Sequence, residues 1–261
     1  MINARGEVIG INAAISSRAA NIGFAVPINQ ARAILPQLRD KGRVARGYIG
    51  VSLRDVDPDL QRSLGLNSGD GALVQDVTPG SPGARAGLRT YDLIVAVDGK
   101  AVSGNDQLIQ LIAARQPGTV ASLQIVRDNH PMNLSVKLAE RPQRDRKGAS
   151  ANDDYPAPQP SSQRGPALGL SVRELDREFA ERFKLPEGMQ GVVISRVEPM
   201  SPAFDADVER GHVLLEINRH PVRSVDDYRR LTANAKAGDI LALYIYKPES
   251  DSRALHTVKI E

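Results

Sequence analysis

Histidine is the side chain best suited to acid–base chemistry near neutral pH, and the chain has four histidines. His130 and His220 each precede a proline in a polar, turn-like segment, so we interpret both as solvated turn residues. His256 lies in a strand-like segment with no serine or acidic residue near it in sequence. His212 replaces Asp92 in an internal repeat described below, which indicates a structural substitution. None of the four follows the H-E-x-x-H spacing of a zinc site.

A nucleophilic serine is not indicated either. A trypsin-like hydrolase needs a serine, a histidine that takes its proton, an aspartate that orients the histidine, and donors for the oxyanion. Ser81 lies in GSPG, which is not a G-x-S-x-G nucleophile elbow, and the same Ser-Pro pair recurs at Ser201. We therefore interpret both serines as turn elements and predict that the chain as it stands is not an enzyme.

The composition is that of a globular chain of roughly two domains, with 261 residues, 41% apolar and 25% charged. The chain has no cysteine, which excludes disulfides and thiolate metal sites, and we predict no metal and no cofactor. A net charge of +3 and an aromatic content of 4% argue against a nucleic-acid surface. No apolar run approaches the ~18 residues of a membrane span, and the first residues lack the pattern of a signal peptide.

Two halves of the chain repeat each other at a spacing of about 120 residues. Four blocks occur twice in the same order: GYIGVSLRDV and PALGLSVREL (47–56 and 166–175), GALVQDVTPGSP and GVVISRVEPMSP (71–82 and 191–202), DLIVAVDGKAV and HVLLEINRHPV (92–102 and 212–222), and DQLIQLI and DDYRRLT (106–112 and 226–232). Four matched blocks in one order indicate two copies of one domain.

The sequences of the two copies indicate the same order of strands and helices. A glycine-containing loop leads into a short strand, a polar helical stretch, a strand, a small-residue turn, a strand, an amphipathic helix and a closing pair of strands. In the first amphipathic helix, Leu108 and Ile112 recur at helical spacing. The sequence therefore predicts a mainly β fold with short helices (α+β), built as two small, partly open β-barrels in tandem.

Residues 141–165 break the globular pattern. The segment RPQRDRKGASANDDYPAPQPSSQRG has four prolines and many charges, and it has no Leu, Ile, Val or Phe. Such a segment cannot offset its ordering entropy by burying apolar surface. We therefore predict a flexible, proline-rich linker between the two copies.

Both repeats resemble PDZ domains of the bacterial HtrA (Do-like) serine proteases. The block GSPGARAGL…DLIVAVDGKAV of the first repeat is typical of that family. The loops at residues 48–51 and 167–170 stand where such domains bind a carboxylate. The resemblance implies a first PDZ domain at residues 43–140 and a second at residues 166–261.

The opening residues resemble the last strands of the protease domain in the same family. In Do-like proteases, segments similar to INARGEVIGINAAI and NIGFAVPIN follow the nucleophile motif Gly-Asn-Ser-Gly-Gly-Pro, and residues 30–38 fit the connecting helix. Residues 1–42 are therefore expected to be a remnant of a trypsin-like β-barrel, with the catalytic His, Asp and Ser all upstream of Met1. The resemblance also implies a periplasmic location and a part in protein quality control.

The resemblance implies peptide binding by strand addition, in which an extended peptide pairs with a sheet edge and backbone amides hold its carboxylate. Gly50 would let these amides converge, and Arg46 would lie near the carboxylate. The apolar pocket and the receiving strand would consist of Tyr48, Ile49, Val51, Ser52, Leu53, Leu108 and Ile112. The corresponding loop of the second repeat is Leu168, Gly169 and Leu170. Leu108 and Ile112 fit the core of a barrel equally well.

The expected partners are C-terminal or extended segments of unfolded proteins. The second repeat departs from the family pattern, because Asp207-Val208 replace Gly87-Leu88 and Gly165 stands at the position of Arg46. For that repeat, domain docking or assembly into a homo-oligomer is as well supported as carboxylate capture. A rival interpretation is that the sequence is a piece of a complete serine endopeptidase.

Overall fold

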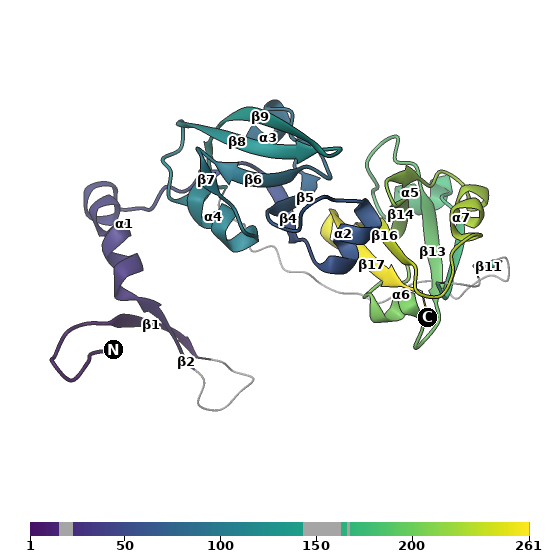
Figure 1. Ribbon diagram of the computed structural model, residues 1–261. Helices are drawn as coiled ribbons and strands as arrows, with labels where there is room; N and C mark the ends of the chain where they lie inside the picture. The colour runs from purple at the N-terminus through teal and green to yellow at the C-terminus, as the bar shows by residue number, and fades with distance from the viewer. Residues whose placement is uncertain (16–22, 143–162, 166–167, 261) are drawn as a thin grey trace.

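The computed structural model describes residues 1–15, 23–142, 163–165 and 168–260. The chain forms an N-terminal arm and two β-rich units that lie next to each other (Figure 1). We refer to residues 43–140 as the first unit and to residues 163–165 and 168–260 as the second unit. The predicted class, mainly β with short helices and two copies of one domain, is confirmed.

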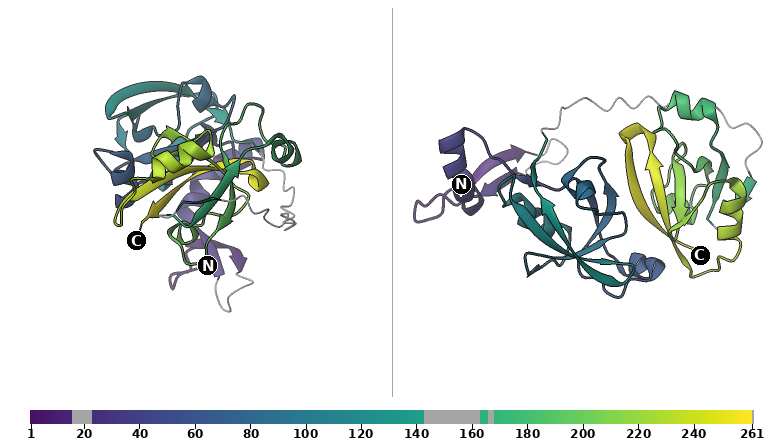
Figure 2. Two further views of the ribbon diagram at one scale, coloured as in Figure 1. Left: turned by 90° about the vertical axis from the view of Figure 1, so that its right-hand side faces the viewer. Right: turned by 90° about the horizontal axis from the view of Figure 1, so that it is seen from above.

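The N-terminal arm is a hairpin followed by a helix, and it stands away from both units (Figures 1 and 2). Strand β1 (Gly10–Ile15) pairs antiparallel with β2 (Gly23–Pro27), and an isolated bridge joins Ile2 to Val8. Helix α1 (Ile28–Lys41) then leads to the first unit, which confirms the predicted connecting helix. The sequence did not indicate the pairing of β1 with β2.

The arm exposes apolar side chains that a folded barrel would bury. They are Ile2 (69% exposed), Val8 (51%), Ile9 (44%), Ile11 (51%), Phe24 (60%) and Val26 (36%). Ile22, in the same part of the predicted protease remnant, lies outside the described residues. Exposed apolar strands of this kind are sites of association with other chains or domains. The assignment of the arm as a protease remnant stays a prediction.

Deletion of residues 1–40 should raise the solubility of the chain and leave its thermal unfolding almost unchanged. The arm packs mainly on itself, through β1 with β2 and α1 with β2, so its removal takes few contacts away from the units. Sedimentation and calorimetric unfolding of the full and shortened chains measure the two effects. A large fall in the melting temperature would show instead that the arm packs on the first unit.

The first unit is an antiparallel sheet in the order β4-β5-β6-β8-β9, with β7 beside β6 and a separate pair β3-β10. Its strands are β3 (Gly47–Tyr48), β4 (Val51–Asp55), β5 (Ala72–Val77), β6 (Leu93–Val97), β7 (Lys100–Ala101), β8 (Val120–Arg127), β9 (His130–Lys137) and β10 (Ala139–Glu140). Its helices are α2 (Pro58–Leu64), α3 (Pro82–Arg85) and α4 (Asn105–Ala113).

The second unit repeats this topology in the order β12-β13-β14-β16-β17, with β15 beside β14 and one further strand, β11, beside β12. Its strands are β11 (Gln163–Gly165), β12 (Leu170–Glu174), β13 (Val192–Val197), β14 (Val213–Ile217), β15 (His220–Pro221), β16 (Ile240–Lys247) and β17 (Ser252–Lys259). Its helices are α5 (Arg177–Arg182), α6 (Pro202–Asp205) and α7 (Val225–Thr232), and a 3-10 turn covers Pro248–Ser250.

The predicted linker differs from the structure at its end. Residues 143–162 lie outside the described residues, but Gln163–Gly165 form β11 and belong to the second sheet. A short polar segment can form a strand when a neighbouring strand offers it an unpaired edge. A prediction based on the composition of this segment could not include the unpaired edge of β12.

The recurring Ser-Pro pairs begin short helices. Ser81 Oγ accepts the Ala84 N–H at 3.2 Å at the start of α3, and Ser201 Oγ accepts the Phe204 N–H at 3.3 Å at the start of α6. A hydroxyl in this capping position stabilises a helix by about 1 kcal/mol. The structure therefore has a four-residue helix where the sequence predicted a turn, and Ser81 and Ser201 are capping residues of these helices.

His256 on β17 is buried in the second unit and has one hydrogen-bond partner. Its Nδ1–H donates to the Ala206 carbonyl at 2.7 Å, and Nε2 is buried without a partner among the described residues. Desolvation is the main cause that lowers the pKa of His256 to about 4, although the bond to Ala206 opposes it. The ring is therefore neutral at pH 7 and structural.

The chain should lose stability as the pH falls from about 6.5 toward 4. In the unfolded chain His256 has an ordinary pKa of about 6.5, so below this pH the unfolded state takes up a proton that the folded state resists. The full decrease in the free energy of unfolding that is due to His256 is about 3 kcal/mol. In thermal unfolding between pH 4 and 8, H256Q should show a smaller loss than the wild type, and H220Q at an exposed turn should match the wild type. An equally steep loss in H256Q would contradict the assignment.

Candidate functional site

The loop that precedes β4 is held by a close contact with α3. Gly50 has a φ of +76°, and a Cβ at this position would lie 2.3 Å from the Cβ of Ser81. The Ile49 carbonyl accepts the Gly83 N–H at 2.7 Å, and the Gly50 carbonyl accepts the Thr78 N–H at 2.9 Å. Two successive carbonyls of the loop are thus turned toward the body of the unit.

The amide groups of the same loop are left available. Among the described residues, the N–H groups of Ile49 and Gly50 have no acceptor. Successive N–H groups next to a left-handed residue form a concave nest that binds anions, and a peptide carboxylate is such an anion. The loop therefore has the geometry of a carboxylate site built from backbone.

The nest lies at the start of a strand with one open edge. Strand β4 pairs with β5 on one side, and within the described part of the chain no strand pairs with its other side. Asp55 Oδ1 accepts the Asn105 N–H at 2.8 Å, so the end of β4 is joined to the start of α4. An open hollow at this end is lined by Asp55, Ser103, Gly104, Asn105, Asp106, Gln107 and Gln110. Together these features outline a groove between β4 and α4.

The predicted pocket residues divide into core and rim. Ile49, Leu108 and Ile112 are at most 5% exposed and belong to the core of the first unit. Val51 and Leu53 on β4 pack against this core and are partly exposed, and Ser52 between them is exposed. Tyr48 is half-buried, and its Cε1 lies 3.2 Å from the position of a Gly50 Cβ. Contact of Leu108 and Ile112 with a peptide stays a prediction.

Arg46 is exposed, and its side chain has no partner among the described residues. Its backbone carbonyl accepts the Arg141 N–H at 3.2 Å, next to the pair formed by β3 and β10. Its role near a carboxylate stays a prediction. The sequence did not single out Gly83, which holds the Ile49 carbonyl, or Asp55, which caps α4. The signal for Gly83 was its place two residues after Ser81 in the block GSPGARAGL, which is typical of the HtrA family.

The second unit has the same loop. Gly169 has a φ of +70°, and a Cβ there would lie 2.2 Å from the Cβ of Ser201. The Leu168 carbonyl accepts the Ala203 N–H at 3.2 Å, and Leu168 and Leu170 are buried in the core. The predicted equivalence of the two loops is therefore present in the backbone.

The edge beside the second loop is not open. Strand β11 pairs antiparallel with β12, with Gly165 opposite Leu170 and Gln163 opposite Val172. Because β13 takes the other side of β12, both edges of this strand are paired. A peptide that added to β12 would have to displace the chain's own β11.

The remaining titratable groups do not form a second site. His130 and His220 are exposed, as predicted, but each begins a strand directly after a turn and does not lie in the turn itself; each ring lies against the carbonyl of the residue two positions before it, at 2.8 and 2.9 Å. His212 Nε2 lies 3.1 Å from Glu249 Oε1, whereas Asp92 at the same position of the first unit pairs with Arg127 at 2.7 Å. Across the described residues there is no cluster of three or more potential metal ligands, and no helix is long and apolar enough to cross a membrane.

Two stretches of the chain match the family profile of the PDZ domain, residues 47–138 and 166–259. The chain belongs to the PDZ-domain family. The first unit is hereafter PDZ1 and the second unit PDZ2. The first range covers the whole sheet from β4 to β9, the second covers the sheet of PDZ2 except β11, and each begins within one residue of the loop that carries Gly50 or Gly169.

The similar proteins are bacterial proteases. The chain is 34% identical over 246 residues to the "Probable periplasmic serine endoprotease DegP-like" of Chlamydia trachomatis, covering 93% of this chain and 46% of the relative. For the protein of the same name from Hahella chejuensis the identity is 34% over 250 residues, with 95% and 51% covered. The solved structure "HtrA-type protease AlgW with tripeptide" is 33% identical with a TM-score of 0.50, covering 55% of this chain and 48% of that chain.

These matches confirm the resemblance to HtrA-type proteases and extend it beyond the two PDZ domains, since they cover almost the whole chain. The chain spans about half the length of the curated relatives that it matches. The matched half carries both PDZ domains and the N-terminal arm.

A Cβ at Gly50 should distort the loop that is predicted to bind a carboxylate. Gly50→Val places a β-branched side chain at a left-handed φ and against Ser81, so peptide affinity should fall at least about tenfold, whereas Gly169→Val should lower it less. Calorimetric titration with a free-acid peptide measures both.

Two variants should be compared, the single variant Gly50→Ala and the double variant Gly50→Ala with Ser81→Gly. The comparison distinguishes a steric clash with the Ser81 Cβ from general misfolding. Removal of the Ser81 Cβ makes room for the alanine, so the double variant should recover part of the affinity. No recovery, in a double variant with an unchanged melting temperature, would show that the close contact does not shape the nest.

Proposed function

We propose that this chain captures the C-termini of extended or unfolded protein segments by strand addition at PDZ1. The observation that carries the proposal is the open edge of β4 directly after the two free amides of Ile49 and Gly50. The peptide would run antiparallel to Val51, Ser52 and Leu53, with its carboxylate in the nest. The similar AlgW structure was solved with a tripeptide, which supports the peptide as the ligand class.

An apolar last residue fits the surroundings of the nest, where Tyr48 covers the loop and Val51 is partly exposed. Farther along the groove the lining is polar, with Asp55, Asp106 and Gln110 around the hollow. A flexible peptide loses conformational freedom when it becomes a strand, so its affinity should be modest, on the order of micromolar or about −8 kcal/mol.

For PDZ2 we propose that peptide capture is suppressed, because β11 pairs with the edge of β12 that corresponds to the open edge of β4. Two loops of the same geometry would then give one binding site per chain. The poorer match of the second repeat to the family pattern supports the same assignment.

We further infer that the chain serves as the substrate-capturing part of a DegP-like periplasmic serine endoprotease. Cleavage would depend on a His, Asp and Ser triad that the resemblance places outside the matched half of the relatives. The periplasm is inferred from the names of those relatives. The alternative, in which the complete protease is the acting enzyme and this sequence is a piece of it, gives PDZ1 the same role.

Amidation of the peptide C-terminus should weaken binding by roughly 1.5–3 kcal/mol, the range of a charge-assisted hydrogen bond. Calorimetry of the full chain with matched free-acid and amidated peptides that end in an apolar residue measures this difference. The free-acid peptide should bind with one site per chain. Equal affinities of the two peptides would overturn carboxylate capture, and two equivalent sites would overturn the suppression of PDZ2.

A further inference from the structure

An apolar cluster joins the two PDZ domains. Five residues of PDZ1 and three residues of PDZ2 form one core; the PDZ1 members are Leu60 and Leu64 on α2, Leu66 just after it, and Leu73 and Leu93 on strands. The PDZ2 members are Ala242 and Tyr244 on β16 and Leu255 on β17, each at most 6% exposed. In two views α2 lies between the sheets, and the strands β16 and β17 face it (Figures 1 and 2).

A comparison of the two repeats shows that this apolar face is specific to PDZ2. Strand β8 of PDZ1 alternates between buried and exposed residues, whereas β16 is buried at six consecutive positions. A strand that is buried on both faces reads as a continuous apolar run. The exposed residues Ser122, Gln124 and Asn133 of PDZ1 stand at the positions of Ala242, Tyr244 and Leu255. The sheet of PDZ2 is thus built to be covered where the sheet of PDZ1 faces water.

Tyr91 of PDZ1 gives a second, independent sign of a built interface. It has a φ of +73°, a conformation that is unfavourable for a bulky residue, and PDZ2 has Gly211 at the same position with a φ of +91°. A strained residue of this kind persists where its side chain is needed. The ring of Tyr91 lies 5.9 Å from that of Tyr244, and its hydroxyl donates to Glu216 Oε2 at 2.6 Å. The Arg219 guanidinium lies 5.1 Å above the same ring.

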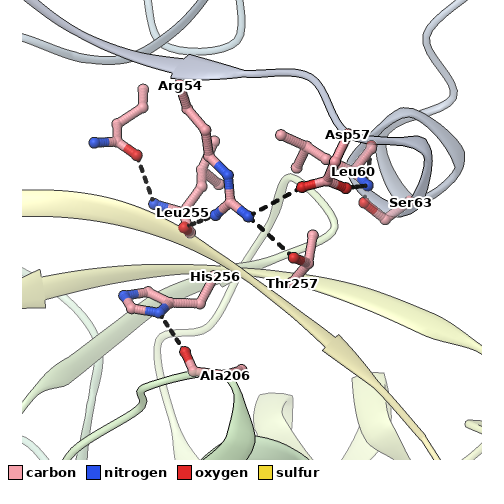
Figure 3. A network of polar contacts seen from close by, with 9 residues as sticks. Arg54, Asp57, Leu60, Ser63, Ala206, Leu255, His256 and Thr257 are labelled. Carbon is pink, nitrogen blue, oxygen red and sulfur yellow. Dashed lines mark hydrogen bonds and ion pairs between the residues drawn. The ribbon is translucent and has the colours of Figure 1, made fainter. Parts of the chain in front are cut away.

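The polar contacts of the interface reach the peptide-receiving strand. Figure 3 shows Arg54 of β4 donating to the Leu255 carbonyl and, at 3.0 Å, to Thr257 Oγ1 on β17. Gln75 accepts the Leu255 N–H at 3.3 Å and donates to Ser52 Oγ on β4 at 3.0 Å. Both backbone groups of Leu255 on the outer edge of β17 are therefore paired with side chains of PDZ1.

We propose that PDZ2 is an intramolecular docking partner of PDZ1, and that its β16–β17 face holds strand β4 so that docking and peptide capture are coupled. The coupling rests on the proposed function of PDZ1. Because linkage is reciprocal, undocking of PDZ2 weakens peptide binding, and a bound peptide strengthens docking by the same factor.

PDZ1 of the same chain, and not PDZ1 of a second copy, is the favoured partner of the β16–β17 face. A tether of 22 residues (141–162) connects the two domains, and a short tether gives an effective concentration in the millimolar range. Charges also match across the interface, with Arg219 Nη1 3.1 Å from Asp128 Oδ1 and Arg253 Nη1 3.6 Å from Asp76 Oδ1. Docking on a second copy is the alternative that the experiment distinguishes.

The first measurement tests docking and uses the full chain. Because the chain has no cysteine, spin labels can be placed on two introduced cysteines at the exposed positions Lys137 of PDZ1 and Asn234 of PDZ2. The distance between the labels should be narrowly distributed at low protein concentration. Broad distances in the wild type, or a narrow distance that appears only at high concentration, would overturn intramolecular docking.

Variants identify the face. Tyr91→Gly installs the residue that PDZ2 uses at this left-handed position, and Tyr244→Gln installs the residue that PDZ1 uses on its exposed strand, so both are compatible with folding. Each should broaden the distance distribution, whereas Gln124→Ala on the exposed strand of PDZ1 should not. Unchanged distances in both interface variants would overturn the assignment of the face.

The second measurement tests coupling. Tyr244→Gln, which lies in PDZ2 and outside the PDZ1 groove, should lower the affinity for a free-acid peptide roughly fivefold or more. Equal affinity in this variant, together with broadened distances, would overturn the coupling. Absence of peptide binding by the wild-type chain would instead remove the proposed function, and the label distances would still decide whether the domains dock.

Discussion

The contact between Gly50 and Ser81 is the constraint on which the site depends. A residue with a side chain fits neither the space beside Ser81 nor the φ of the loop. With the loop in this position, the carbonyls of Ile49 and Gly50 bond inward and their amides are left for a ligand. The same close approach between Gly169 and Ser201 shows that the constraint belongs to the domain and not to one copy.

Two copies of one loop have acquired different surroundings. In PDZ1 the strand after the loop keeps an open edge, and in PDZ2 the chain itself fills that edge with β11. The outer faces of the two sheets also differ. Gln124 on β8 of PDZ1 is exposed to water, whereas Tyr244 at the same position on β16 of PDZ2 is buried against PDZ1. Differentiation of this kind needs few substitutions, since the core of each domain is unaffected by residues on the outer face of its sheet.

The sequence predicted the repeated domains, their helices and the loop glycines, because these follow from local periodicity and from turn chemistry. It left domain docking of the second repeat open without locating an interface, and it did not predict β11, because both features depend on contacts between segments that are far apart in the chain. One signal was nevertheless present in the run ILALYIY of β16, whose continuous apolar character differs from the alternation VASLQIV of β8. A second signal was that Tyr91 occupies the position that Gly211 has in the second repeat, since tyrosine rarely takes a left-handed φ.

The shared apolar cluster has a consequence for the boundaries at which this protein can be divided. A cut between residues 140 and 163 respects both sheets, yet it would leave Leu60 and Leu64 of one product and Tyr244 and Leu255 of the other facing solvent. The outer edge of β17 would also lose the side chains that pair with the Leu255 peptide groups. The boundary between the two folded sheets is therefore not a boundary at which both products keep their apolar residues buried. The smallest piece that keeps this shared cluster covered contains both PDZ domains.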